Sequence, residues 1–259
     1  MKILDKFSLK GKVSLITGGE RGIGLAIAIG FAQAGADIAI AGVDESSAAL
    51  AKDLIEAEGK RFIFIKTDVT DENQVAEMTA KVMEFYGKID VLCNNAGISK
   101  RAEAAEMTLD IWRKVIDTNL TSQFIVSREV CQIMQRQMSG NIVNIASMSG
   151  IIVNRPLSQC NYNASKAGVI QLTKSLASEW VKYGVRVNAV APGYIRTPIT
   201  EHRFSNPDDP AVPIWNAMTP MGRPGSPDEI VGAALYFASD ASTFTTGAVL
   251  IVDGGYTIW

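Results

Sequence analysis

A tyrosine and a lysine four residues apart carry the clearest chemical signal in this sequence. Tyr162 and Lys166 stand at i and i+4 of an expected helix, so their side chains share one face. A phenol has an ordinary pKa of about 10, which a nearby ammonium lowers by favouring the phenolate. Tyr162 can then exchange a proton with an alcohol or a ketone. On its own a YxxxK spacing is more often an ordinary surface pair, so this chemistry depends on the motifs around it.

A glycine-rich turn near the N-terminus supplies one such motif. An expected strand at Val13–Thr17 runs into the segment TGGERGIG (residues 17–24), and a helix is expected at Ile23–Ala34. Glycines let the backbone approach a pyrophosphate closely, and a helix N-terminus offers free N–H groups to it. Without a ligand, the same residues would form a tight strand-to-helix turn. The strand–turn–helix context favours a dinucleotide site.

The elements that must position these groups alternate along the chain. Short β-branched runs predict strands at Val13–Thr17, Asp37–Ala41, Phe62–Lys66, Asp90–Cys93, Asn141–Ala146, Arg186–Val190 and Ala248–Val252. Helical spacing of apolar residues predicts helices between them, including Ile23–Ala34, Val75–Tyr86 and Tyr162–Trp180. Strands that alternate with helices form βαβ units around a parallel sheet. The pattern indicates an α/β fold, and residues 1–259 read as a single domain.

One segment departs from this alternation. Eight of the nine prolines lie between Pro192 and Pro227, together with Trp215 and two methionines. Such a stretch cannot form a central strand or a long helix. A long loop in a compact domain is commonly a functional lid. We therefore expect a substrate lid at about residues 194–226.

The motifs together resemble those of the short-chain dehydrogenase/reductase family. The glycine spacing is TGxxxGIG, and the resemblance continues through NNAG at residues 94–97, YxxxK at Tyr162 and Lys166, and DGG at residues 253–255. It spans nearly the whole chain, from about Leu9 to Trp259. The resemblance implies a Rossmann-type, doubly wound fold with a parallel seven-stranded sheet. It also implies an NAD(P)-dependent oxidoreductase that interconverts a secondary alcohol and its ketone.

The same resemblance implies roles for residues at the matching positions. The catalytic set is Asn119, Ser147, Tyr162 and Lys166, with Tyr162 as general acid and base and Asn119 holding a water linked to Lys166. Besides Tyr162 and Lys166, the cofactor-binding residues would be Gly18, Arg21, Gly22, Ile23, Gly24, Asp44, Asp68, Val69, Asn95, Ala96, Gly97, Pro192, Gly193, Ile195 and Thr197. Read from the residues alone, Asn119 is equally a helix-capping or helix-kinking asparagine.

Two serines compete for the position beside Tyr162. Ser149 stands at the commoner family interval from Tyr162, whereas Ser147 follows the strand sequence NIA as the family serine does. We assign Ser147 to the catalytic role and infer a two-residue insertion within residues 150–161. Ser149 then becomes a substrate contact or a turn-stabilising hydroxyl.

The residues after the second strand leave the choice of cofactor open. NAD enzymes commonly place an acid there for the ribose hydroxyls, and NADP enzymes place a basic residue for the 2′-phosphate. Gly42 holds the usual acidic position, with Asp44 and Glu45 close by. Arg21 in the glycine loop can grip a 2′-phosphate, but Glu20 beside it would repel one. The balance favours NAD, with NADP as the alternative.

The substrate region most resembles the polyol dehydrogenases that act on galactitol, sorbitol and xylitol. The resemblance rests on residues 147–156 and on the terminal DGGYTIW. It implies a polyol or ketose substrate whose hydroxyls contact Ser149, Asn154 and Gln159. Two alternatives remain: a reductase of 3-oxoacyl thioesters or simple ketones with the same fold, and a non-catalytic dinucleotide-binding protein.

Composition excludes several other classes. The net charge of −2 does not favour nucleic acid or an anionic membrane, and no apolar run is long enough to span a bilayer. The charged N-terminus lacks the apolar core of a secretory signal, so we expect a cytoplasmic protein. Three dispersed cysteines and the single His202 indicate no metal site. The resemblance implies a homotetramer, assembled through helices at about Leu120–Gln137 and Tyr162–Tyr183.

Overall fold

A single parallel sheet forms the centre of the protein. The computed structural model describes residues 2–259, so Met1, the first residue of the expected domain, lies outside it. Within that range the sheet has seven strands in the order β3-β2-β1-β4-β5-β6-β7. The strands are β1 (Val13–Thr17), β2 (Asp37–Gly42), β3 (Phe62–Lys66), β4 (Val91–Asn94), β5 (Gly140–Ile145), β6 (Val185–Pro192) and β7 (Val249–Val252). This confirms the predicted Rossmann-type sheet, with small shifts at the strand ends.

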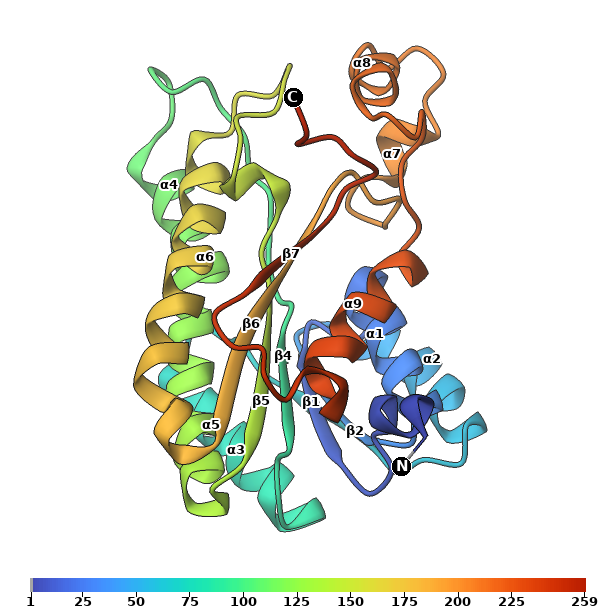
Figure 1. The fold of residues 1–259 in the computed structure, drawn as a ribbon. Coiled ribbons are helices and arrows are strands. Elements are labelled where there is room, and N and C mark those ends of the chain that lie inside the picture. Colours follow the sequence, from blue (N-terminus) through green and yellow to red (C-terminus); the bar gives the residue numbers. More distant parts are fainter. Residues whose placement is uncertain (1) are drawn as a thin grey trace.

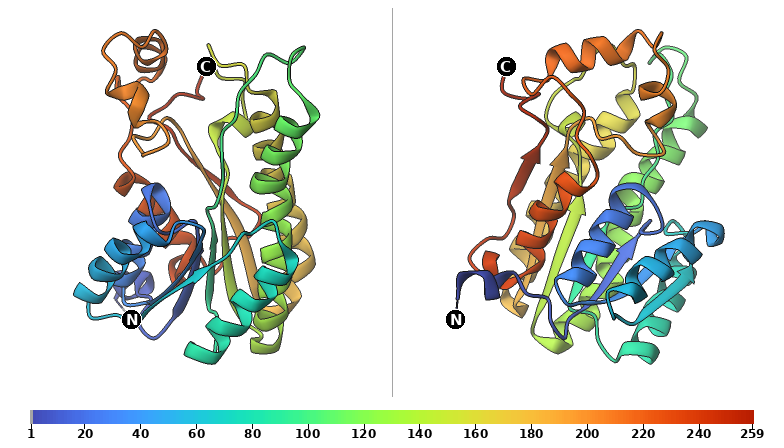
Figure 2. Two further views of the ribbon diagram at one scale, coloured as in Figure 1. Left: turned by 180° about the vertical axis from the view of Figure 1, so that it is seen from behind. Right: turned by 90° about the vertical axis from the view of Figure 1, so that its right-hand side faces the viewer.

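Helices cover both faces of this sheet, as Figures 1 and 2 show. On one face lie α1 (Gly22–Gln33), α2 (Glu45–Ala57) and α9 (Asp228–Ala238), and on the other lie α3 (Glu72–Tyr86), α4 (Leu109–Ile116), α5 (Ser122–Gln137) and α6 (Cys160–Trp180). Short 3-10 turns occur at Ile3–Phe7, Met148–Gly150, Val181–Tyr183 and Asp240–Ser242. The helix ranges predicted from the sequence include neither α2 nor α4.

Because helices cover both faces of the sheet, its strands are apolar along most of their length. Every residue of β1 is buried, because helices pack on both sides of it. Leu15 belongs to a core cluster with α3, α5 and α6, whereas its neighbour Ile16 belongs to a second cluster with α1 and α9. Successive side chains of one strand therefore anchor opposite helical layers, which fixes the register of the sheet.

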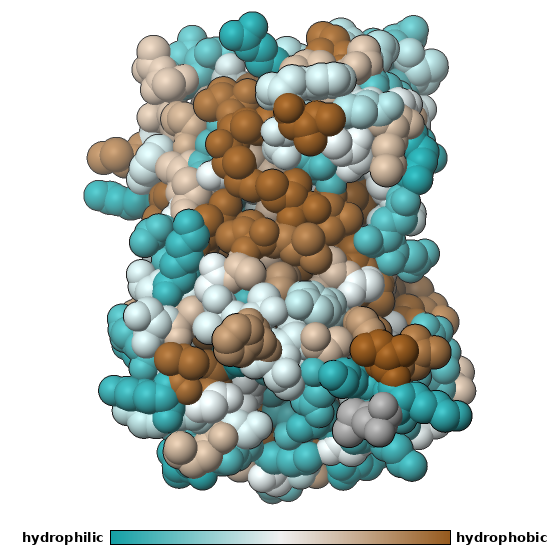
Figure 3. Space-filling model, viewed as in Figure 1, coloured by the Kyte–Doolittle hydropathy of each residue, from teal (hydrophilic) through white to brown (hydrophobic). Residues whose placement is uncertain are grey.

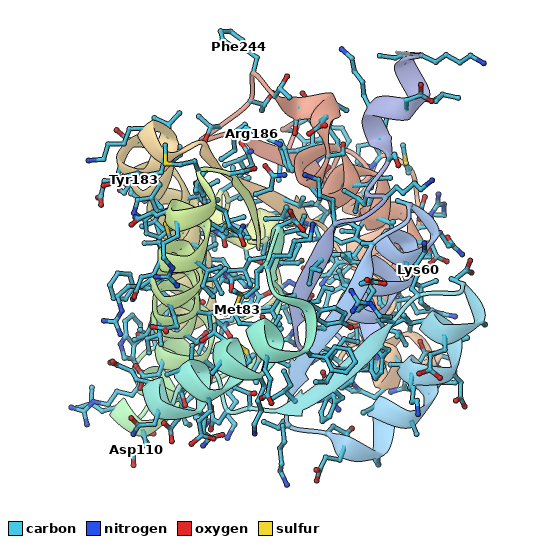
Figure 4. All side chains as sticks on the ribbon, turned by 90° about the horizontal axis from the view of Figure 1, so that it is seen from below. Lys60, Met83, Asp110, Tyr183, Arg186 and Phe244 are labelled. Carbon is cyan, nitrogen blue, oxygen red and sulfur yellow. The ribbon has the colours of Figure 1, made fainter. Side chains whose placement is uncertain are left out.

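None of the residues predicted for catalysis or binding lies at the end of the sheet where the strands begin. In the view from below, Met83 points toward the core, and Phe244 projects away from the fold (Figure 4). Arg186 at this end is held by the Ser242 hydroxyl at 2.7 Å and the Ser239 carbonyl at 3.0 Å. These contacts attach the segment after α9 to the start of β6.

The proline-rich segment lies at the opposite end, above the carboxyl ends of the strands (Figure 1). It contains two short helices, α7 (Glu201–Phe204) and α8 (Ala211–Met218). Trp215 of α8 is almost fully buried and stacks on Tyr194, with ring centroids 4.1 Å apart. No helix of residues 2–259 is both long and apolar enough to cross a membrane.

Candidate active site

A pocket of about 520 Å³ opens at the carboxyl ends of the strands. Successive strands are added on one side of β1 as far as β3, and on its other side from β4 onward. Ligands bind in open α/β sheets at the point between β1 and β4 where this order reverses. The pocket is lined by all the residues predicted for catalysis, cofactor binding and substrate binding except Gly24, Asp44 and Asn119. The structure therefore brings together groups that are far apart in the sequence.

The glycine loop forms a cradle that larger residues would fill. Gly22, with φ of +57°, occupies the left-handed region that favours glycine. A Cβ at Gly24 would overlap the carbonyl oxygen of Gly18 and the side-chain nitrogen of Asn95. Arg21 precedes the first turn of α1 without a side-chain cap, so the N–H groups of that turn remain available. This backbone fits a pyrophosphate group, as the sequence predicts.

The NNAG segment fastens β4 to this loop. Thr17 Oγ1 accepts hydrogen bonds from the backbone N–H groups of Asn95 and Ala96, at 3.0 and 3.1 Å. The Asn95 amide in turn donates to the carbonyl oxygens of Thr17 and Gly18, at 3.1 and 2.8 Å. The side chain of Asn95 thus holds the shape of the cradle, while Ala96 and Gly97 line the pocket.

Asn119 lies behind the pocket, in a segment of π-helix at Asp117–Thr121. Its Oδ1 accepts from the Ile98 N–H at 2.8 Å, and its Nδ2 donates to the Ile98 carbonyl at 2.9 Å and to Ser165 Oγ at 3.2 Å. These bonds use the side chain to position the loop after NNAG. Short π-helical turns are frequent at functional sites, and here the turn that contains Asn119 lies between the end of α4 and the start of α5.

Tyr162, Ser147 and Lys166 meet at the floor of the pocket. Burial raises the pKa of Tyr162, while its interaction with Ser147 and the charge of Arg101 lower it. Lys166 is buried and donates to the Ile145 carbonyl at 2.8 Å, and burial lowers its pKa to about 8. The Lys166 Nζ lies 5.7 Å from the ring centre of Tyr162, and the expected effect of its charge on the pKa of Tyr162 stays a prediction.

Arg101 is the cation that sequence reasoning missed. It lines the pocket near Tyr162, and it forms no ion pair or side-chain hydrogen bond within residues 2–259. Burial and the neighbouring Arg203 lower its pKa, but a guanidinium remains charged at any physiological pH. Its place four residues after NNAG was the available signal. The structure places a positive charge without an ion-pair partner in residues 2–259 beside Tyr162.

The three predicted substrate residues form one buried polar cluster. Ser149 Oγ donates to Asn154 Oδ1 at 3.1 Å, and Gln159 Nε2 donates to the same oxygen at 3.2 Å. Asn154 Nδ2 donates to the Tyr194 hydroxyl at 2.9 Å. The stacking of Tyr194 on Trp215 connects this cluster to the proline-rich segment. Ser147 also accepts a bond from the Ser149 N–H at 3.1 Å, so both serines lie at the pocket.

Asp44 lies apart from the pocket lining, although the resemblance implied cofactor contact. Its carboxylate caps α2 by accepting from Ser46 and Ser47, and these bonds lower its pKa to about 2. Its Oδ2 also lies 3.7 Å from Nη1 of Arg21. The side chain is therefore engaged in holding the start of α2 and the glycine loop.

Comparisons with known proteins agree with this geometry. A family model described as enoyl-(acyl carrier protein) reductase matches residues 18–257. The chain is 44% identical over 257 residues to a sorbose reductase of Candida albicans, covering 98% of this chain and 90% of that one. It is 42% identical over 253 residues to an L-tagatose-forming galactitol 2-dehydrogenase of Cereibacter sphaeroides, covering 98% of both. A solved gluconate 5-dehydrogenase of Burkholderia cenocepacia with NADP and tartrate superimposes with a TM-score of 0.93 at 37% identity, covering all of both chains.

The chain belongs to the short-chain dehydrogenase/reductase family, within its polyol dehydrogenase branch. It is an oxidoreductase that interconverts a secondary alcohol and its ketone with NAD or NADP. These findings confirm the family, the fold and the reaction class predicted from the motifs.

Proposed function

We propose that the protein oxidises a polyol, or reduces the matching ketose, with NAD as cofactor. The observation that carries this proposal is the buried cluster of Ser149, Asn154 and Gln159 beside Tyr162. A polyhydroxylated substrate needs several polar partners, because a buried hydroxyl without a hydrogen bond is costly. The sorbose reductase and galactitol 2-dehydrogenase among the relatives act on substrates of this kind.

In this proposal, the residues at the floor of the pocket have separate roles in proton transfer. Tyr162 takes the proton of the substrate hydroxyl during oxidation and returns it to the ketone oxygen during reduction. Ser147 donates a hydrogen bond to that oxygen as charge develops on it. Lys166 holds the nicotinamide ribose, and Asn119 holds a water that passes the proton from Lys166 to solvent. A nicotinamide bound at this site would supply the hydride acceptor for oxidation and the hydride donor for reduction.

The cofactor lies along the glycine loop and the strand ends in this proposal. Gly18, Gly22, Ile23 and Gly24 would hold its pyrophosphate, and the other contacts would be Arg21, Asp68, Val69, Asn95, Ala96, Gly97, Pro192, Gly193, Ile195 and Thr197, without the Asp44 side chain that caps α2. The preference for NAD is supported by the acidic groups around the loop, since Asp44 already shares the charge of Arg21. Because the Burkholderia structure contains NADP, both cofactors must be compared directly.

A substrate screen tests the proposal. Hexitols and pentitols with NAD, the matching ketoses with NADH, and 3-oxoacyl thioesters with either reduced cofactor are assayed by absorbance at the nicotinamide band. Turnover of polyols or ketoses supports the proposal. Activity confined to acyl thioesters would reject it and favour the reductase alternative.

A polyhydroxylated acid is a second candidate substrate, favoured by Arg101. A guanidinium without a protein partner fits a carboxylate through two parallel hydrogen bonds. The Burkholderia relative is named for gluconate and holds tartrate, both of which carry carboxylates. We expect Arg101→Gln to lower kcat/KM for aldonates by about 10-fold or more, equivalent to a charge-assisted bond of about 1.5–3 kcal/mol, and to leave neutral hexitols nearly unchanged. Equal effects on both substrate classes would exclude this role.

The proline-rich segment, about residues 194–226, serves in this account as the substrate lid. Tyr194, Ile195 and residues 197–200 line the pocket, and α8 packs on Tyr194 through Trp215. A lid of this kind excludes water during hydride transfer. Deleting α8 should therefore raise the KM for substrate more than the KM for cofactor, whereas an unchanged KM for substrate would contradict a lid.

We also infer a homotetramer. Apolar side chains gather on the face formed by β7 and the C-terminal segment (Figure 3), including Leu250, Ile251, Ile258 and Trp259. An uncovered apolar sheet edge is a ready site for association. Tyr256 does not join this face, since it packs inside its own chain against Tyr194. Light scattering after gel filtration should give four times the mass of the chain, and a monomer would contradict the inference.

A further inference from the structure

A buried carboxylate faces the pocket beside the position at which the sequence lacks one. Gly42 ends β2, where an acid commonly binds the ribose hydroxyls of NAD. β1 and β2 run parallel, with Thr17 paired to Ala41, so the residues that follow the two strands lie side by side. Glu20 follows β1 in this way and lines the pocket together with Gly42. An acid thus reaches the end of β2 from the neighbouring strand.

The missing side chain at Gly42 provides the space for this carboxylate. A Cβ built at Gly42 would overlap the carboxylate oxygens of Glu20 and lie 2.6 Å from its Cδ. The φ of Gly42 is not in the left-handed region, so the backbone itself does not require glycine there. The carboxylate of Glu20 therefore occupies the space that the glycine at position 42 leaves open.

The carboxylate of Glu20 is incompletely satisfied by the protein. Only 4% of the residue is exposed, and its Oε2 has no hydrogen-bond partner within residues 2–259. A buried carboxylate without full hydrogen bonding is costly, so such groups are normally paired. Burial raises the pKa of Glu20, against the lowering effect of backbone amides and Arg21. A ligand that supplies hydroxyl donors would offset this cost.

We propose that Glu20 is the residue that selects NAD over NADP, which rests on the proposed use of NAD. Its carboxylate accepts hydrogen bonds from the adenosine ribose hydroxyls, and its negative charge repels the 2′-phosphate of NADP. Arg21 does not cancel this effect, because Asp44 lies 3.7 Å from its guanidinium. Glu20 therefore replaces the acid that the end of β2 lacks.

The substitution Glu20→Gln removes the negative charge of this side chain and keeps its shape, so it tests the effect of that charge on the choice between NAD and NADP. Dissociation constants of NAD and NADP are measured by calorimetric titration of the protein alone, alongside kcat/KM with each cofactor. The ratio of Kd for NADP to Kd for NAD should fall by about 10-fold or more, equivalent to about 1.4 kcal/mol. Glu45→Gln is the control, since Glu45 is exposed, pairs with Lys66 at 3.0 Å and lies outside the pocket lining. It should leave the ratio unchanged.

Three further variants keep the test decisive. Glu20→Ser alone should lower the ratio as Glu20→Gln does, and adding Gly42→Asp to it should restore the preference by returning an acid to the end of β2. Gly42→Ala alone should displace Glu20 and lower the ratio.

The outcomes separate the two proposals. If the unmodified protein prefers NADP, the proposed cofactor fails and the role of Glu20 fails with it. If it prefers NAD while Glu20→Gln and Glu20→Ser keep the ratio within about twofold, or about 0.4 kcal/mol, only the role of Glu20 is overturned.

Discussion

Replacing Asn154 by alanine probes the polar cluster on which the proposed substrate depends. The Asn154 amide oxygen accepts from Ser149 and Gln159, and its nitrogen donates to the Tyr194 hydroxyl. Only 2% of the residue is exposed, so water does not readily replace these partners. The substitution therefore removes three hydrogen bonds at once and leaves three buried groups each lacking one partner.

The size of the effect follows from these contacts. Each hydrogen bond contributes about 0.5–1.5 kcal/mol net, so Asn154→Ala should lower the free energy of unfolding by about 2–4 kcal/mol. If Asn154 also binds a substrate hydroxyl, kcat/KM for a polyol should fall by a further factor of about 10, equivalent to one such bond of about 1.4 kcal/mol. The affinity for NAD should not change, because the cluster lies away from the glycine loop.

Urea denaturation, steady-state kinetics and cofactor titration measure these three quantities. Asn163→Ala is the matched control: Asn163 accepts one bond from Gln159, at 3.1 Å, and does not line the pocket. We expect it to cost about 1 kcal/mol of stability and to leave kcat/KM unchanged. A stability loss below about 1 kcal/mol for Asn154→Ala would refute the contribution of the three hydrogen bonds, and equal kinetics in both variants would refute the assignment of this cluster to substrate binding.

Two other variants test the cofactor cradle and the buried lysine. Gly24→Ala places a Cβ onto the Gly18 carbonyl and the Asn95 amide, so the affinity for NAD in a calorimetric titration should fall by about 10-fold or more; unchanged affinity would contradict the close packing of the loop. Burial lowers the pKa of Lys166 from 10.5 to about 8, so between these pH values the folded protein holds fewer protons than the unfolded chain. Its free energy of unfolding should therefore rise with pH across that window, by about 3 kcal/mol relative to Lys166→Met in urea denaturation; parallel pH profiles would show that Lys166 is not desolvated.

Local patterns were sufficient to predict the sheet and most of the site. The strands around Leu15 and Ile142 are apolar on both faces. This pattern predicts buried strands without knowledge of which helices cover them. Gly22 and Gly24 follow β1 directly, so their role depends on a few adjacent residues. Tyr162 and Lys166 lie one turn apart in α6, and their common face follows from helix geometry alone.

Other features depend on contacts between distant segments and could not be predicted in the same way. The approach of Glu20 to Gly42 arises from the register of β1 against β2. The unpaired state of Arg101 depends on which acids fold near it, and Asp209 instead pairs with Arg203 at 3.1 Å. The side chain of Asn119 in the π-helical turn bonds to the backbone of Ile98, 21 residues earlier, and no local propensity encodes that contact.

Substitution of Tyr162 by phenylalanine tests whether this side chain transfers the proton of the reaction. The variant loses only the phenolic oxygen, so the pocket should keep its shape. We expect turnover of the best polyol in the substrate screen to fall by about 10²–10⁴-fold, as for loss of a general acid–base group, while binding of NAD stays measurable. Turnover close to that of the unmodified protein would contradict the account of Tyr162 as the proton-transferring residue.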